Sequence, residues 1–249
     1  MNDTIDLWFV DAETAGDSAF QQQAEAILSE DERARRDRFL FPKLRRDFAT
    51  TRWLVRSILS ERLSVPAREL RFRTNAYGRP FLVAYPELSF NISHTEGLIA
   101  LAVAQRGAIG VDVERLQTRR ATSALADFSF AASERTALNA VGADEFDEAF
   151  FTYWTLKESY IKALGTGLST PLDSFSFSVE GDKSIGFAPP PQIADDTPPH
   201  FWLLRPRPTY LCALCVRHAS PPFTLRACNI TPLDSKSAFD VAVLRCSPD

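Results

Sequence analysis

The stretch AIGVDVE, residues 108–114, has the alternating pattern of a β-strand with two different faces. Successive side chains of a strand point to opposite faces, so the three β-branched residues share one face. Asp112 and Glu114 lie on the other face, separated by about 7 Å of strand rise. Like charges at this separation repel each other. The strand therefore predicts a compensating cation on its polar face.

The composition excludes several classes of protein. The chain has 249 residues, 45% of them hydrophobic and 24% charged, as in a globular protein of one large or two small domains. A net charge of −4 argues against a general nucleic-acid binder. The first residues have no secretory signal pattern, and no apolar run is long enough to span a bilayer. We expect a cytoplasmic protein without nucleic-acid or membrane partners.

The order of predicted helices and strands indicates an α+β fold. Helical spacing of apolar residues predicts three helices, at 21–38, 45–63 and 146–164. Between and after these helices, short β-like runs alternate with turns. The expected strands are 70–75, 88–93, 97–104, 108–114, 175–180, 200–206 and 209–218. Each half of the chain is thus a helix followed by strands.

Four cysteines occur, and Cys212 and Cys215 form a C-x-x-C pair. A zinc or redox site needs a second ligand pair or a strand-to-helix turn, and the sequence provides neither near this pair. We interpret both as buried cysteines of a strand.

A glutamate lies on the aromatic side of the predicted helix at 146–164. Trp154, Glu158 and Ile161 share one stripe at helical spacing. An exposed i, i+4 pair between Glu158 and Lys162 is the simpler interpretation of the charges alone. However, a carboxylate between apolar side chains is partly desolvated and needs a partner.

Two further stretches carry groups suited to binding an anion. FNISHTEG, residues 90–97, places Ser93 and His94 at the end of a strand, where side chains project into clefts. YGRP, residues 77–80, is a turn that presents Arg79. An exposed hairpin arginine is an equally good interpretation of Arg79 taken alone.

Together these residues predict an anion site with a metal ion. The hard oxygen ligands are Asp112, Glu114 and Glu158, and the phosphate donors are Lys43, Arg79, His94, Lys157 and Lys162. Mg²⁺ is commonly held by a few carboxylates, with the phosphates of the substrate and water completing its shell. No P-loop or dinucleotide-binding fingerprint occurs in the sequence.

The segments FNISHT, GVDVE and WTLKESYIKALGTGLS, in this order, resemble the 4′-phosphopantetheinyl transferases. The length resembles the two-lobed type that activates surfactin synthetase. The resemblance implies two similar lobes, each a small antiparallel sheet on a long helix, with a boundary that we place between 1–108 and 109–249. It also implies coenzyme A in the cleft between the lobes and Mg²⁺ on its pyrophosphate, and we expect Mn²⁺ to be able to replace Mg²⁺.

The resemblance also assigns roles to individual residues. It implies that the metal ligands are Asp112, Glu114 and Glu158, with Glu158 also the candidate base and Lys162 close to the pyrophosphate. The implied coenzyme A site consists of Lys43, Arg79, Ser93, His94, Asp112, Lys157 and Lys162. The family usually has lysine at the position of Arg79, and the choice of Lys43 rests on the loosest part of the match.

The implied reaction is attack by a serine hydroxyl of an apo acyl or peptidyl carrier protein on coenzyme A, which releases 3′,5′-ADP. We expect a monomeric enzyme. Two alternatives use the same residues: a Mg²⁺-dependent phosphohydrolase, and a non-catalytic module that binds coenzyme A or a carrier. The pathway of the carrier, which is fatty-acid, polyketide or peptide synthesis, stays open.

The surface that meets the carrier is predicted from local charge. Carrier proteins are generally acidic around the helix that follows their modified serine. The first candidate is a basic run with Arg115, Arg119 and Arg120, next to the apolar stretch ADFSFAA at 126–132. The second candidate is RARRDRF at 33–39.

Overall fold

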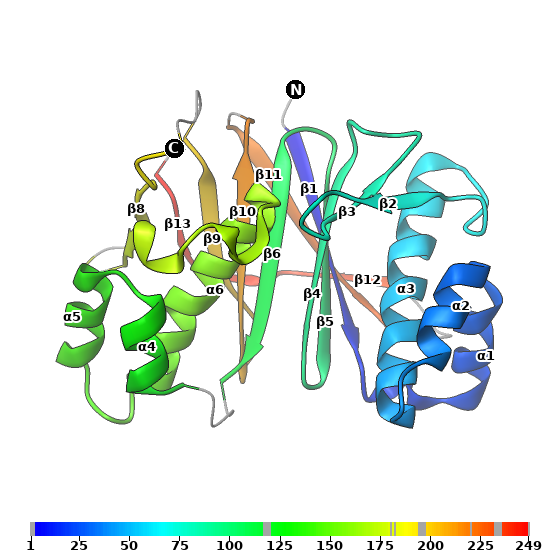
Figure 1. The fold of residues 1–249 in the computed structure, drawn as a ribbon, viewed down its shortest axis with the longest axis horizontal. Helices are drawn as coiled ribbons and strands as arrows, with labels where there is room; N and C mark the ends of the chain where they lie inside the picture. The colour runs from blue at the N-terminus through cyan, green and yellow to red at the C-terminus, as the bar shows by residue number, and fades with distance from the viewer. Residues whose placement is uncertain are drawn as a thin grey trace.

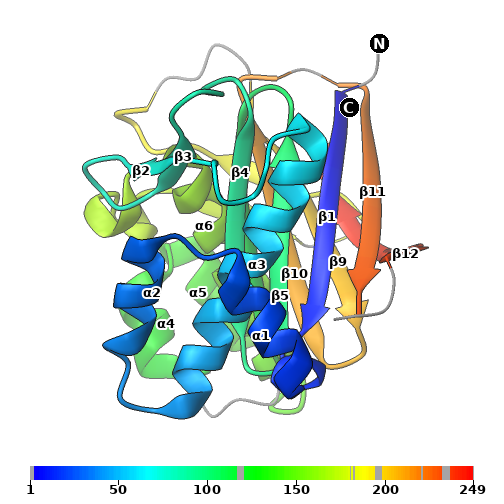
Figure 2. The ribbon, with the colours of Figure 1, turned by 90° about the vertical axis from the view of Figure 1, so that its right-hand side faces the viewer.

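A computed structural model describes residues 3–116, 121–179, 181, 183–193, 198–219, 221–231 and 236–248. The side chains of Asp3, Thr14 and Leu168 are outside this description. Two sheets stand next to each other, with helices on the outer side of each (Figures 1 and 2).

The first sheet has the strand order β12-β11-β1-β5-β4. Its strands are β1 (Asp3–Asp11), β4 (Ser89–Thr95), β5 (Leu98–Ala104), β11 (Phe223–Ile230) and β12 (Lys236–Phe239). β1 pairs with β5 in antiparallel and with β11 in parallel orientation. The first sheet therefore contains segments from both ends of the chain.

The helix α3 (Pro42–Leu63) covers the first sheet from the outside, and α1 (Ser18–Ala26) and α2 (Glu30–Asp37) pack against α3. The long helix α3 packs its buried leucines, valine and isoleucine against β4 and β5. Apolar burial of this kind is the main favourable contribution to folding.

The second sheet has the strand order β13-β9-β10-β6. Its strands are β6 (Ala108–Arg115), β9 (His200–Arg207), β10 (Tyr210–Arg217) and β13 (Ala242–Cys246). Helix α6 (Phe146–Leu164) covers its outer face, and α4 (Ser123–Ser129) and α5 (Ala132–Ala140) lie beside α6. The inner faces of both sheets pack together in one apolar cluster that includes β1, β5, β6 and β10.

Two small ribbons complete the fold. One pairs β2 (Phe72–Thr74) with β3 (Pro80–Leu82), and the other pairs β7 (Ser176–Ser178) with β8 (Gly186–Ala188). Three single 3₁₀ turns, η1 to η3, lie at Thr14–Gly16, Gly167–Ser169 and Leu172–Ser174. The second and third follow α6 directly.

The predicted α+β class is confirmed, and α6 has the bounds expected from the sequence. The single helix predicted at 21–38 is wrong, because α1 ends at Ala26 and a second helix, α2, begins at Glu30. There Ser29 and Glu32 form a capping box, which starts a new helix. Cys212 and Cys215 are buried in β10, as predicted.

The prediction was also incomplete at both ends of the chain. β1, β11, β12 and β13 were not expected, nor were the short strands β3 and β8, and the turn at 77–80 joins β2 to β3. β11 and β12 follow residue 109 in the chain and pair within the first sheet. The lobe boundary between 1–108 and 109–249 stays a prediction.

Candidate active site

A glycine in β6 lets α6 lie directly on the polar face of this strand. The apolar residues of β6 pack between the two sheets, as the alternation predicts. On the other face, a Cβ atom at Gly110 would lie 2.0 Å from the carbonyl oxygen of Ser159 and 2.4 Å from the nitrogen of Ala163. Because glycine has no Cβ, the helix can approach this closely. Residues of the last turn of α6 thereby come within reach of Asp112.

Asp112, Lys162 and Ser93 form a compact polar group at this contact. The Lys162 Nζ atom lies 2.7 Å from Asp112 Oδ1 and 2.9 Å from Ser93 Oγ. The Ser93 hydroxyl donates to Asp112 Oδ1 at 2.8 Å and accepts from the backbone N–H of Val113 at 3.3 Å. Three separate elements, β4, β6 and α6, thus meet at one carboxylate oxygen.

The second oxygen of Asp112 has no such partner. Asp112 is 4% exposed, and its Oδ2 atom is buried without a hydrogen bond to any described residue. A buried carboxylate oxygen without a partner is costly, because it loses its hydration without replacement. This oxygen is therefore in the position where a cation or a donor from a ligand would be bound.

The polar side chains of β4 join the two sheets at this point. The Asn91 Oδ1 atom accepts the N–H of Val111 at 2.9 Å, and the Thr95 hydroxyl donates to Glu114 at 3.2 Å. Asn91 and Ser93 thus accept the N–H groups of Val111 and Val113 at the open edge of β6, where a neighbouring strand would otherwise offer backbone partners. The contact between the lobes therefore depends on side chains of the FNISHT segment. The sequence analysis did not assign Asn91 or Thr95, although their alternation with apolar residues was visible.

Glu158 and Lys162 line a pocket of about 190 Å³ beside this group. The lining residues are Tyr77, Gly78, Arg79, Asn91, Glu158, Ile161, Lys162, Gly165 and Gly167. Within the described part of the chain, no three His, Cys, Asp or Glu side chains lie close enough together to hold a metal ion. The structure thus does not assemble Asp112, Glu114 and Glu158 into a ready-made metal cluster.

Arg79 connects the β2–β3 turn to the end of α6. Its guanidinium donates to the carbonyl oxygens of Ala163 at 2.9 Å and Ile109 at 3.3 Å. A cation is favourable at the carboxyl end of a helix, where carbonyl groups lack helical partners. Burial, together with the charge of Arg217, lowers the pKa of Arg79 from its usual value. Asn75, which the sequence analysis missed, supports the same helix end by donating to Gly165 at 2.7 Å.

His94 and Lys43 lie near each other on the side of the first lobe. His94 follows Ser93 in β4 and has an exposed side chain. Partial burial of the ring lowers the pKa of His94, and the charge of Lys162 lowers it further. Lys43 also lowers this pKa, whereas Asp47 raises it. Lys43 is exposed and pairs with Asp47 at 2.8 Å. Both residues are accessible to an anion in this region.

Lys157 points away from this group, into the interior of the second lobe. Its Nζ atom lies 2.8 Å from Glu134 and donates to the carbonyl oxygens of Leu172 and Phe175, each at 2.7 Å. Burial lowers the pKa of Lys157, and Glu134 opposes this shift. The structure therefore does not bring Lys157 together with the other predicted coenzyme A residues.

The predicted carrier residues are described only in part. Arg119 and Arg120 lie outside the described residues. The guanidinium of Arg115 lies 3.6 Å from the carboxylate of Glu96, in the hairpin between β4 and β5.

Comparison with known proteins identifies the family of this chain. Residues 108–215 match the 4′-phosphopantetheinyl transferase superfamily, and residues 15–106 match the N-terminal region of a 4′-phosphopantetheinyl transferase. The transferase HetI of Nostoc sp. is 36% identical over 172 residues, which are 68% of this chain and 72% of HetI. The chain belongs to the 4′-phosphopantetheinyl transferase superfamily.

Other relatives of this transferase extend the match. The 4′-phosphopantetheinyl transferase Sfp of Bacillus subtilis is 33% identical over 169 residues, 68% of this chain and 73% of Sfp. The transferase psf-1 of Bacillus pumilus is 29% identical over 196 residues, 79% of this chain and 82% of psf-1. The two-lobed, Sfp-like type predicted from the sequence is confirmed.

The family also establishes the activity. The enzyme uses coenzyme A and transfers 4′-phosphopantetheine to carrier proteins. The two alternatives, a phosphohydrolase and a non-catalytic binding module, do not agree with this assignment. None of the helices in the described ranges combines the length and hydropathy needed to cross a bilayer.

Proposed function

We propose that the transferase moves 4′-phosphopantetheine from coenzyme A to a serine of an apo acyl or peptidyl carrier protein, with Mg²⁺ held at Asp112 and 3′,5′-ADP as the second product. The supporting observation is the buried Asp112 Oδ2 atom, which has no partner among the described residues and lies beside a lysine that suits a phosphate. The same carboxylate thus binds a lysine that can donate to an anion through one oxygen and offers its other oxygen to a cation.

The residues present fit a Mg²⁺ ion whose coordination shell is completed by phosphate oxygens of the substrate. Mg²⁺ often uses one or two carboxylates, together with phosphate oxygens and water, and so does not require a preassembled cluster. Asp112 would hold it, with Glu114 and Glu158 as the further ligands. Bound there, the ion offsets negative charge on the pyrophosphate during transfer. Mn²⁺ accepts similar oxygen ligands, so we expect it to support activity.

The protein residues position the substrate and move the proton. Lys162 donates to the pyrophosphate, where it stabilises the charge that develops on the leaving group. The 3′-phosphate lies near Ser93, and the side chains of His94 and Lys43 can donate to it. The serine oxygen of the carrier attacks the β-phosphorus, and the bond from this phosphorus to the bridging oxygen breaks. Glu158, at the pocket wall, accepts the proton of the serine.

The test is to incubate the protein with coenzyme A, Mg²⁺ and several apo carriers, and to weigh the carriers by mass spectrometry. We expect a phosphopantetheine adduct on the serine and an equal amount of 3′,5′-ADP. Chelation of the metal should stop both, and added Mn²⁺ should restore them. An adduct that forms at the same rate in chelator would contradict the proposed role of the metal. The monomeric state and the cytoplasmic location stay predictions.

A further inference from the structure

A group of exposed apolar side chains lies at the start of α3. Leu40 is 85% exposed, Phe41 66% and Leu44 44%. They are three of the eight large hydrophobic side chains that are exposed in the described part of the chain, and they fall within five residues. Clustered exposed apolar residues, unlike scattered ones, usually mark a contact surface.

Cations surround these apolar residues. Between residues 33 and 46 the sequence has seven arginines or lysines and one acidic residue, in a chain with a net charge of −4. The exposed members are Arg33, Arg35, Arg38, Lys43, Arg45 and Arg46. We call these six cations, together with Leu40, Phe41 and Leu44, the α2–α3 surface. Its composition fits a partner that is both acidic and apolar.

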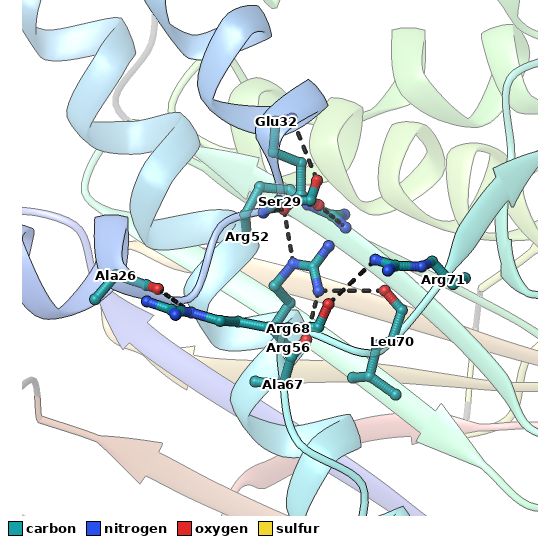
Figure 3. Close-up of polar contacts among 9 residues, drawn as sticks. All are labelled: Ala26, Ser29, Glu32, Arg52, Arg56, Ala67, Arg68, Leu70 and Arg71. Carbon is teal, nitrogen blue, oxygen red and sulfur yellow. Dashed lines mark hydrogen bonds and ion pairs between the residues drawn. The ribbon is translucent and has the colours of Figure 1, made fainter.

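A buried network fixes the position of α2 relative to α3 (Figure 3). Glu32 binds Arg52 through Oε1 at 2.5 Å and Arg56 through Oε2 at 2.6 Å. The same glutamate completes the capping box with Ser29. Arg56, which is 2% exposed, also donates to the carbonyl oxygen of Leu70 at 3.3 Å. The α2–α3 surface is therefore presented on a fixed support, which lowers the entropy cost of binding a partner.

The α2–α3 surface lies next to the active site. The charges of Lys43 and Asp47, in α3, contribute to the pKa of His94, as do the charges of Lys162 and Asp112. His94 is therefore near both the α2–α3 surface and the active site. The first turn of α3 and the hairpin between β4 and β5 lie at the same end of the molecule (Figures 1 and 2). A partner bound at this surface is thus close to the polar group of Asp112, Lys162 and Ser93.

We propose that the α2–α3 surface is the docking site of the carrier protein, whose acidic side chains meet its cations and whose apolar side chains meet Leu40 and Phe41. The proposal rests on the proposed function, which requires a protein substrate. The other candidate includes Phe128, which is 85% exposed, but α4 contains Asp127 and no lysine or arginine, and the nearby Arg119 and Arg120 lie outside the described residues. Charge complementarity therefore favours the α2–α3 surface for an acidic partner.

The first experiment removes the apolar contact without changing charge. In Leu40→Ser/Phe41→Ser, Phe41 is the N-cap residue of α3, and serine is a favourable N-cap, so the fold should be retained. We expect KM for the carrier to rise about tenfold, the loss typical of an apolar contact residue, and KM for coenzyme A to stay constant. Phe128→Ser is the matched control, with an unchanged KM for the carrier.

The second experiment reverses charge. Arg33→Glu/Arg38→Glu should also raise KM for the carrier, and added salt should reduce the difference from the wild type, because exposed charges are screened. Carrier KM values equal to the wild type in both double variants would overturn the proposal, as would a rise in the Phe128→Ser control alone. Loss of binding to anionic vesicles with unchanged carrier KM would overturn it in favour of a membrane contact. A wild type that modifies no carrier would instead overturn the proposed function.

Discussion

Two lysines of α6, five residues apart, form ion pairs of nearly equal length in two different surroundings. The Lys157 ammonium lies 2.8 Å from Glu134, and the Lys162 ammonium lies 2.7 Å from Asp112. The side chains of the first pair are 1% and 0% exposed, and those of the second are 26% and 6% exposed. Distance alone therefore does not distinguish the two pairs.

The two pairs differ in how completely their hydrogen-bonding capacity is used. Each lysine has three acceptors, so the difference lies in the carboxylates. Both oxygens of Glu134 accept backbone N–H groups, from Phe177 and from Ala131. At the other pair, one oxygen of Asp112 has no hydrogen-bond partner among the described residues. A fully satisfied buried pair stabilises one arrangement of the chain, whereas an incompletely satisfied one can bind a ligand.

The largest effect is expected when the satisfied pair is broken. Lys157→Met leaves Glu134 buried without its cation, which should lower the free energy of unfolding by about 3–5 kcal/mol. Denaturant unfolding followed by circular dichroism measures this loss. The matched variant Lys162→Met should cost clearly less stability, because Asp112 keeps the Ser93 hydroxyl and Lys162 is partly exposed to solvent. Equal losses for the two variants would remove the distinction between the pairs.

The second effect concerns activity and the incompletely satisfied pair. Asp112→Asn keeps the shape of the side chain but removes its charge, and should lower kcat/KM for transfer by about a hundredfold or more, or roughly 3 kcal/mol. Its free energy of unfolding should stay near that of the wild type. Steady-state transfer assays and denaturant unfolding together measure both quantities. Near-normal turnover in this variant would show that Asp112 does not act in catalysis.

The relation between the two lysines was only partly predictable from the sequence. Residues five apart on a helix differ by about 140° in direction, so Lys157 and Lys162 cannot share a face. Which lysine points to β6 depends on Gly110, whose missing Cβ admits α6, and on Glu134, which is distant in sequence. The strand alternation predicted the face of Asp112, because that is a local property.

Long-range pairing explains the strands that were missed. In β1 the alternation of Ile5, Leu7 and Phe9 is masked by the continuous apolar run at 7–10, and the position of the strand in the sheet depends on pairing with β5 and β11. Such partners cannot be found by a local pattern. In contrast, α6 has its expected bounds because its apolar spacing and the left-handed Gly165 after it are local signals.

The smallest effect is expected on stability at low pH, and it involves a third ionic group, Glu32 with Arg52 and Arg56. Burial would raise the pKa of this carboxyl, but the hydrogen bond from Arg56 and the charge of Arg52 outweigh it, so the pKa lies below the usual 4.5. The stabilisation is therefore present above that value and is lost as the pH falls through the lower folded-state pKa. Between about pH 6 and about pH 3, the wild type should lose more stability than Glu32→Gln. Parallel acid dependence in both proteins, measured by thermal unfolding, would contradict this assignment.

The parallel pairing of β1 with β11 has a consequence for the order of folding during synthesis. Asp3 pairs with Phe223, and Val10 with Ile230. β1 therefore cannot pair with β11 until most of the protein has been synthesised. Contacts of such sequence separation form slowly, because a long loop must close first. A nascent chain that ends before residue 223 has β1 with an unprotected edge, which can pair with another chain. Pairing of β11 with β1 thus completes the first sheet late in synthesis. Ribosome-bound fragments that lack β11 should be the species that require chaperones.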